Sequence, residues 1–207
     1  MIDPWNELER LPVAMADAVK PHLDATTLAG YQRFLAAMVH YTRGSGERLR
    51  HAAARAPSAD LAAFFDRLAR EEAGHYRLAE ADLAAFGGAP DHASGGDVPA
   101  EVTAFHRFWM ESDEPATWLG ALYVLESVGG HLGEAAAKNL ARLGLGRDQV
   151  RFVMVHLEAD VEHGAEAAEH ARRHLDGDGG RLLEAARSAA AFWIGLHARA
   201  FSGAVTP

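Results

Sequence analysis

Residues 156–171 read HLEADVEHGAEAAEHA, which is rich in alanine and charged residues and lacks the alternating pattern of a β-strand. Within this stretch His156, Asp160 and His163 follow one another at intervals of four and three residues. That spacing places side chains on one face of an α-helix. Because Phe152 and Val155 lead into the same face, we expect it to be turned toward the protein interior. The stretch therefore predicts a helix that presents two imidazoles and one carboxylate to the core.

Similar helical periodicity and alanine content continue over most of the 207 residues. We expect Pro21 to end the first helix and Ser58 to be the N-cap of the third, and the RGSGE sequence at residues 43–47 is a candidate interruption of the second. Short turns between long helices predict a single-domain, all-α bundle over residues 1–207. The seven predicted helices cover about residues 4–19, 24–54, 58–86, 99–111, 115–143, 148–176 and 181–201.

The composition excludes several kinds of site and partner. The chain has 29 acidic and 20 basic residues, a net charge of −9 and no basic cluster, so nucleic acid is not an expected partner. The absence of cysteine excludes disulfides, thiolate metal sites and a cysteine nucleophile. No run approaches 18 apolar residues, and the N-terminal MIDPWNELERL does not resemble a signal peptide. We therefore expect a cytoplasmic protein without membrane contact.

Three of the predicted helices carry acidic and histidine side chains near their midpoints. The third helix reads LAREEAGHY around Glu72 and His75. The fifth carries Glu126 within the apolar sequence LGALYVLESVGGHLG, and the sixth carries the face that begins at His156. Long helices joined by short turns run antiparallel, so their midpoints meet at one level of a bundle. A carboxylate buried at that level is unfavourable unless it is protonated or binds a cation.

These positions form a set of nitrogen and oxygen donors suited to two metal ions. Glu72 and His75 have the E-x-x-H spacing that lets one helix offer two ligands, and Glu71 is an alternative to Glu72. Imidazole and carboxylate ligands favour iron or manganese. We therefore predict a centre of two Fe(II) ions, with manganese as the alternative metal, that uses O₂ as co-substrate. The predicted metal ligands are Glu72, His75, Glu126, His156, Asp160 and His163.

The sequences EEAGH at residues 71–75, LYVLESVGGHLG at 122–133 and HLEADVEH at 156–163 resemble those of the haem-oxygenase-like diiron oxidases and oxygenases. Members of that group share a glutamate and a histidine on one core helix, a glutamate on a second and H-x₃-D-x₂-H on a third. The resemblance covers roughly residues 30–175. It implies a haem-oxygenase-like fold, the six iron ligands named above and a homodimer as the default assembly. It also implies a small-molecule substrate of the amine, amino-acid or fatty-acid type, which undergoes N-oxygenation or carbon–carbon cleavage.

Two other functions fit part of the pattern. LGALYVLESVGGHLG also resembles the glycine-bearing distal helix of haem oxygenase, in which the backbone approaches haem, but His22 would be a poor proximal ligand. A non-catalytic helical protein that binds a small molecule would need only a polar core network and no metal. Thiaminase-type hydrolysis in the same fold uses a cysteine, which this chain lacks.

The substrate pocket is predicted less sharply than the metal ligands. Gly129 and Gly130 form a plausible kink beside which the substrate would approach. Arg33, Arg43 and Arg77 are candidate charged anchors with no distinguishing sequence context, and His106 is interpreted as a surface or structural residue. The aromatic residues that are candidates for the pocket wall are Phe105, Phe108, Trp109, Trp118, Tyr123, Phe192 and Trp193.

Overall fold

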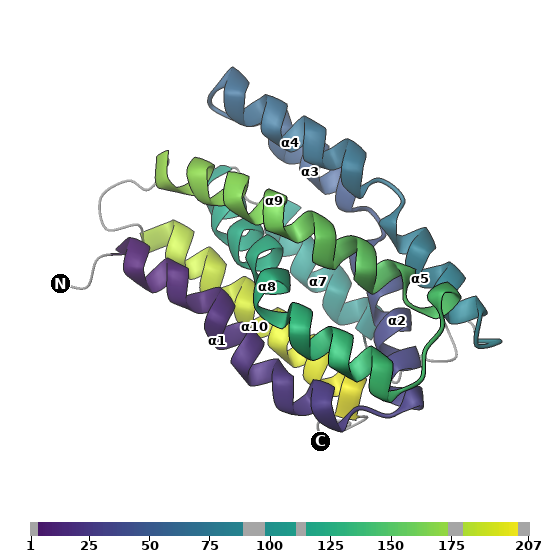
Figure 1. Cartoon of the computed structure of the whole chain (residues 1–207). Coiled ribbons are helices and arrows are strands. Elements are labelled where there is room, and N and C mark those ends of the chain that lie inside the picture. The colour runs from purple at the N-terminus through teal and green to yellow at the C-terminus, as the bar shows by residue number, and fades with distance from the viewer. Residues whose placement is uncertain (1–3, 89–97, 111–114, 174–179, 203–207) are drawn as a thin grey trace.

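The computed structural model describes residues 4–88, 98–110, 115–173 and 180–202. Every regular element in these ranges is a helix (Figure 1), so the predicted all-α class is confirmed. Within the same ranges, no helix is long and apolar enough to cross a membrane. The helices are α1 (Pro4–Ala25), α2 (Leu28–Thr42), α3 (Ser45–Ala53), α4 (Ala59–Glu72), α5 (His75–Ala84), α7 (Val98–Met110), α8 (Pro115–Arg142), the 3₁₀ helix η1 (Arg147–Gln149), α9 (Arg151–Arg173) and α10 (Gly180–Ser202).

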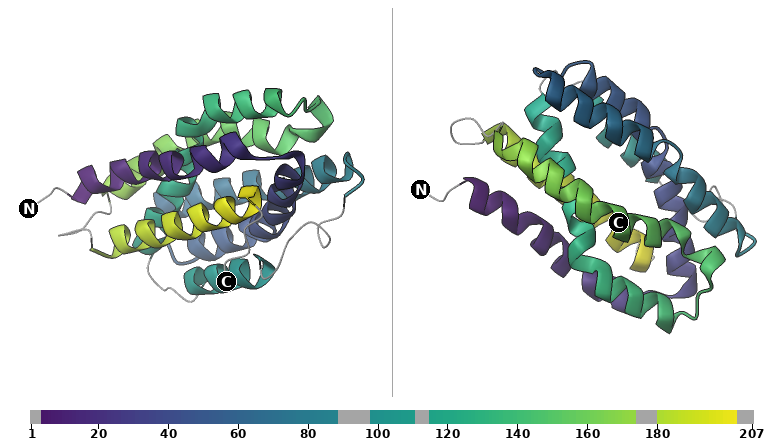
Figure 2. Two further views of the ribbon diagram at one scale, coloured as in Figure 1. Left: turned by 90° about the horizontal axis from the view of Figure 1, so that it is seen from below. Right: turned by 45° about the horizontal axis from the view of Figure 1, so that its top comes forward.

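The four longest of the described helices, α1, α8, α9 and α10, form the larger part of the bundle (Figure 1). Helix α8 packs against α9 and α10, and α1 packs against both α8 and α10. On the other side α2 lies beside α5 and α10, while α3 pairs with α4. Figure 2 shows the α3–α4 pair at the edge of the bundle, and ion pairs such as that of Asp60 with Arg173 join α4 to α9.

Apolar side chains from α1, α8 and α10 fill the centre of the bundle. Leu8 of α1, Leu119 and Val124 of α8, and Leu196 of α10 are fully buried. Burial of one such side chain contributes roughly 1.5–3 kcal/mol relative to an exposed position. This core fixes α8, which carries Glu126, relative to its neighbours.

The first helix is longer than predicted, because Pro21 does not end it. Helix α1 continues to Ala25 with Pro21 in its interior. A proline at such a position removes one backbone hydrogen bond and costs about 3 kcal/mol in a helix interior. Val19 and Leu23, on either side of Pro21, are buried against the bundle. Their packing compensates for the missing hydrogen bond.

Two of the predicted helices are each divided by a glycine with a left-handed backbone. Gly44 (φ 86°) separates α2 from α3 within RGSGE, and Gly74 (φ 108°) separates α4 from α5. The break at Gly74 corrects the prediction of one continuous third helix. The two breaks lie close together. A Cβ atom added to Gly46 would fall 2.8 Å from the carbonyl oxygen of Ala69 and 3.3 Å from the Cβ of Ala73, which shows how closely α3 approaches the end of α4. The α3–α4 pair therefore changes direction as a unit relative to α2 and α5 (Figure 1).

The start of α9 is held by residues from two other helices. Asp82 of α5 is fully buried, and its carboxylate accepts hydrogen bonds from the backbone N–H of Phe152 at 2.7 Å and from Arg151 at 3.1 Å. A carboxylate at a helix N-terminus satisfies a free N–H group and interacts favourably with the helix dipole. The hydroxyl of Tyr31 in α2 donates to the carbonyl of Gln149 at 2.8 Å. These contacts fix the position of α9 relative to α2 and α5.

Candidate metal centre

The predicted face of α9 does point into the bundle. His163 has 6% of its surface exposed, and His156 and Asp160 are partly buried. Glu158 and Glu162, on the other side of the helix, are exposed, as expected for a solvated face. The face of α9 that carries the H-x₃-D-x₂-H residues is therefore turned toward the interior, as the sequence predicts.

Glu126 approaches this face from α8. Its Oε2 atom lies 3.2 Å from Nδ1 of His163, and Nε2 of the same ring lies 3.0 Å from Oε2 of Glu71 on α4. The hydrogen bond with Glu126 is the largest of the effects that raise the pKa of His163 to about 9. With both ring nitrogens protonated, His163 supplies a positive charge to the carboxylates around it.

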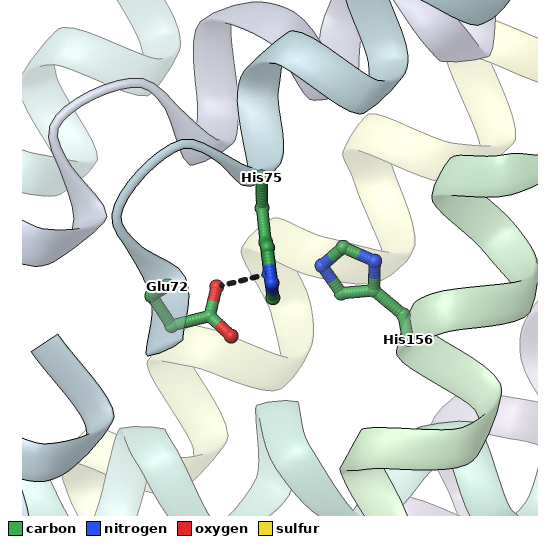
Figure 3. Close-up of side chains that lie close together, drawn as sticks. All are labelled: Glu72, His75 and His156. Carbon is green, nitrogen blue, oxygen red and sulfur yellow. Dashed lines mark hydrogen bonds and ion pairs between the residues drawn. The ribbon is translucent and has the colours of Figure 1, made fainter. Parts of the chain in front are cut away.

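Glu72 and His75 approach from the two sides of the break at Gly74. Glu72 is the last residue of α4 and His75 is the first of α5, so the prediction that one continuous helix carries both is wrong. The left-handed Gly74 turns the chain between them, and Nδ1 of His75 donates to Oε2 of Glu72 at 3.0 Å (Figure 3). Figure 3 also shows His156 pointing from α9 toward His75; the centres of the two rings are 4.8 Å apart.

The six predicted ligands lie together as two groups of three. Within each group the ligand atoms all lie within 4.8 Å of one another. Carboxylate and imidazole in these proportions are donors that first-row metal ions accept. The first group is Glu72, His75 and His156, and the second is Glu126, Asp160 and His163.

The structure distinguishes the two glutamates that the sequence leaves as alternatives. Glu72 is buried, with 8% of its surface exposed, and belongs to the first group. The side chain of Glu71 is 40% exposed and forms an ion pair with Arg67 at 3.1 Å. Glu71 also touches His163, so it borders the second group from outside. The burial of Glu72 favours it as the ligand.

Two of the three buried carboxylates, those of Glu126 and Asp160, are short of positive charge. Burial raises the pKa of Asp160, and the negative charges of Glu126 and Glu72 raise it further. Burial likewise raises the pKa of Glu126, although its hydrogen bond with His163 opposes the change. Among the described residues, the carboxylate of Asp160 has no hydrogen-bond or ion-pair partner. Carboxylates gathered in this way are stabilised by a bound cation, so the residues present fit a metal centre.

A hydrogen bond orients the ring of His156. Its Nδ1 atom donates to the carbonyl oxygen of Phe152 one turn earlier, at 2.7 Å. This bond leaves Nε2 as the nitrogen with a free lone pair, and fixing the second nitrogen in this manner is common among metal-bound histidines. Burial lowers the pKa of His156, which keeps the ring in the neutral form that a metal requires.

A cavity of about 230 Å³ adjoins the two groups. Pockets that bind small organic molecules are concave and mostly apolar, with a few polar groups that fix orientation. This cavity has that character, because apolar and aromatic side chains from α1, α2, α8 and α10 form most of its wall. Four of the six candidate ligands line it: Glu72, Glu126, His156 and Asp160.

The aromatic wall agrees only in part with the sequence-based expectation. Phe105, Trp118 and Trp193 line the cavity, whereas Tyr123 and Phe192 do not. The side chains of Phe108 and Trp109 lie outside the described part of the chain. Tyr123 packs instead against Trp5, and Phe192 stacks on Phe105 from outside the cavity. The direction of the Tyr123 and Phe192 side chains depends on how the helices pack against one another, and the sequence pattern does not specify that packing.

The candidate charged anchors are wrong. Arg33 bonds to the carbonyl of Ala200, and Arg43 and Arg77 are exposed; none of the three lines the cavity. The cationic side chain that does line it is Arg48, and His106 lies beside it. No sequence signal identifies Arg48, because its position depends on the turn that Gly44 introduces.

The family of the chain is identified by comparison with known proteins. The family model described as "iron-containing redox enzyme" matches residues 32–198. The chain belongs to this family. The match includes α4, α5, α8 and α9, and therefore every candidate ligand. No curated protein matches the chain significantly.

Solved structures confirm the haem-oxygenase-like fold of this family member. A domain of unknown function with that fold from Shewanella denitrificans is 17% identical, with a TM-score of 0.74 over 96% of this chain and 88% of the other. A TenA homologue from Pseudomonas syringae is 13% identical, with a TM-score of 0.76 over 95% and 90% of the two chains. A TenA homologue from P. horikoshii is also 13% identical, with a TM-score of 0.73 over 97% of each chain. At these identities the similarity concerns the fold alone.

Proposed function

We propose that this family member is a non-haem diiron oxidase or oxygenase that acts on a small organic substrate. The observation that carries the proposal is the meeting of three carboxylates and three imidazoles in two groups beside one buried cavity. Membership of the iron-containing redox family supports iron as the metal. Iron held by these residues would supply the electrons for O₂ activation.

The chain's own residues have separable roles in this proposal. His75 and His156 would hold a metal ion in the first group, and Asp160 and His163 would hold one in the second. Glu126, which belongs to the second group, is the candidate for a carboxylate shared between the two groups. Its pKa, which is raised mainly by burial, responds both to Glu72 of the first group and to His163 of the second. The apolar cavity wall limits the access of water and admits an organic substrate.

Anaerobic titration with Fe(II) tests the proposal. We expect up to two iron ions per chain, followed by O₂ consumption and a change in visible absorption when the loaded protein meets air. Replacing Asp160 or His163 by alanine should reduce the iron bound per chain from two toward one and abolish O₂ uptake, while preserving the helical circular dichroism spectrum. Iron binding by either variant at the wild-type ratio would contradict the assignment.

Two controls separate this proposal from its alternatives. Glu158→Ala changes an exposed carboxylate on the same helix and should leave iron binding unchanged. Adding haem to the metal-free chain should give no Soret band, whereas a haem oxygenase would give one. A non-catalytic protein with a polar core network would bind neither iron nor haem.

A further inference from the structure

The side chain of Arg48 on α3 lines the same cavity as the carboxylates of the candidate metal centre. It is partly buried, although arginine normally stays exposed or pairs with an acid when it is taken from water. Burial lowers the pKa of this guanidinium to about 10. At neutral pH it therefore remains charged, at a cost that a nearby anion would relieve.

The hydrogen-bond partners of Arg48 are all uncharged. Its Nη atoms donate to the carbonyls of Tyr41 at 3.1 Å and Arg43 at 3.2 Å, and to the hydroxyl of Ser45 at 2.9 Å. Nδ1 of His106 accepts a fourth hydrogen bond at 3.0 Å. Neutral acceptors hold the guanidinium in place but do not neutralise it. Among the described residues, Arg48 forms no ion pair with a carboxylate.

His106 does not supply the missing negative charge. Because its Nδ1 accepts from Arg48, the ring carries its proton on Nε2. Burial and the positive charge of Arg48 lower the pKa of His106 to about 3, so the ring stays neutral. The Nε2 atom is buried and has no hydrogen-bond partner in the described part of the chain. Within the described residues, this corner of the cavity therefore holds a positive charge without an ion-pair partner and an N–H donor without an acceptor.

The rest of the cavity lining favours a ligand with a single negative charge over a positively charged amine. The only acidic side chains that line the described wall are Glu72, Glu126 and Asp160, and all three belong to the candidate metal centre. No carboxylate remains to pair with an ammonium group. Between the two ends the wall is mostly apolar, with side chains such as Phe34 and Trp193.

The cationic corner formed by Arg48 and His106 and the metal centre border the same cavity. Tyr41 also lines the cavity, and its pKa, which is raised mainly by burial, is lowered by Arg48 and raised by Glu126 and Asp160. The phenol therefore lies within electrostatic reach of both ends. One small molecule can occupy both, with its charged end at Arg48 and its body beside the metal ligands.

We propose that the substrate of this site is a small monocarboxylic acid, whose carboxylate binds to Arg48 and His106 and whose apolar body lies in the cavity beside the metal centre. The term substrate rests on the function proposed above, whereas the anion-binding corner does not depend on bound metal. Arg48 is thus the residue that selects an acid over the corresponding amide or amine.

Calorimetry with three matched probes tests the inference: octanoate, octanamide and octylamine. The full chain is used in two forms, one treated with chelator and one loaded anaerobically with Fe(II). Octanoate should bind both forms at least about tenfold more tightly than uncharged octanamide, and the iron-loaded form at least about tenfold more tightly than cationic octylamine. Equal binding of octanoate and octanamide by the wild-type chain would overturn the proposal without any variant.

Variants then assign the selectivity to one side chain. Arg48→Gln should weaken octanoate binding at least about tenfold and leave octanamide binding unchanged, while Arg48→Lys should retain part of the preference. Arg43→Gln is the matched control, since that side chain pairs with Glu80 at the surface and does not line the cavity. Circular dichroism checks that each variant is folded. Unchanged octanoate affinity in folded Arg48→Gln would overturn the assignment.

The two proposals fail in different ways. If the chain binds no iron but octanoate still depends on Arg48, the anion site stands and the diiron function is wrong. If iron binds at two per chain but the acid is not preferred, the diiron function stands and the substrate class is wrong.

Discussion

The carboxylate of Asp160 on α9 lies against the backbone of Gly129 on α8. A Cβ atom at position 129 would fall 2.9 Å from the Cβ and 3.0 Å from the Cγ of Asp160, closer than carbon atoms normally approach. The carboxylate thus occupies space that any side chain at 129 would need. A second close approach follows one turn later on α9, where a Cβ on Gly164 would fall 3.1 Å from the carbonyl of Glu126. Two glycines therefore bring α8 and α9 together at the level of the second ligand group.

Gly129→Ala should move Asp160 out of the second group and weaken metal binding by about tenfold to a hundredfold. The helix itself should not suffer, because alanine is the better helix former. Anaerobic calorimetry with Fe(II) or Mn(II) measures the change. Gly130→Ala is the neighbouring control, since a Cβ there meets nothing within 4 Å. It should bind metal like the wild type, and equal binding by both variants would disprove the role given to Gly129.

Glu72→Gln should reduce the iron bound per chain from two toward one, because the amide that replaces Glu72 is a weaker metal ligand than the carboxylate. Glu71→Gln should retain the full ratio, and its affinity should stay level or rise, since Glu71 competes for Nε2 of His163. Metal analysis after desalting gives both ratios. The reverse order of effects would show that Glu71 is the ligand.

Asp82→Ala should lower the free energy of unfolding by about 2 kcal/mol, because it leaves the backbone N–H of Phe152 without its acceptor in a buried position. The loss should also disturb His156, whose ring is held by the carbonyl of Phe152. Urea denaturation of the metal-free chain measures the effect. Arg151→Gln removes the second partner of Asp82, and since its side chain is 46% exposed it should cost less than about 1 kcal/mol.

The neutral ring of His197 should make the fold less stable in acid. Burial lowers the pKa of His197 from an ordinary 6.5 to about 4. Between these two values the unfolded chain binds a proton that the folded chain does not, so the free energy of unfolding decreases as the pH falls. The full contribution is on the order of 3 kcal/mol.

The comparison variant for this effect is His197→Phe, which keeps the stacking on Trp193 but cannot titrate. Its free energy of unfolding should fall less steeply than that of the wild type between pH 6.5 and 4, and the two curves should run parallel above pH 7. Parallel curves over the whole range would mean that the folded and unfolded chains protonate this ring at the same pH, and would contradict the lowered pKa.

Much of the candidate site could be predicted from sequence because it depends on spacing within single helices. His156, Asp160 and His163 share a face of α9 for reasons of helical geometry alone. Glu126 stands out because it is a carboxylate within an apolar run. Neither inference needs knowledge of how the helices are arranged, and the all-α class follows from the same periodicity.

Other features depended on contacts between segments distant in sequence. A glycine in a helical pattern does not reveal whether it adopts a positive φ, so the break at Gly74 and the choice of Glu72 over Glu71 became visible only in the fold. Arg48 is one of many arginines in the sequence, and only the turn at Gly44 brings it to the cavity. The sequence by itself determined the helical class and the chemistry of the ligands, because both follow from local periodicity and side-chain type. The tertiary structure decided how the six candidate ligands divide into two groups and which cationic side chain lines the same cavity, because both depend on how separate helices pack.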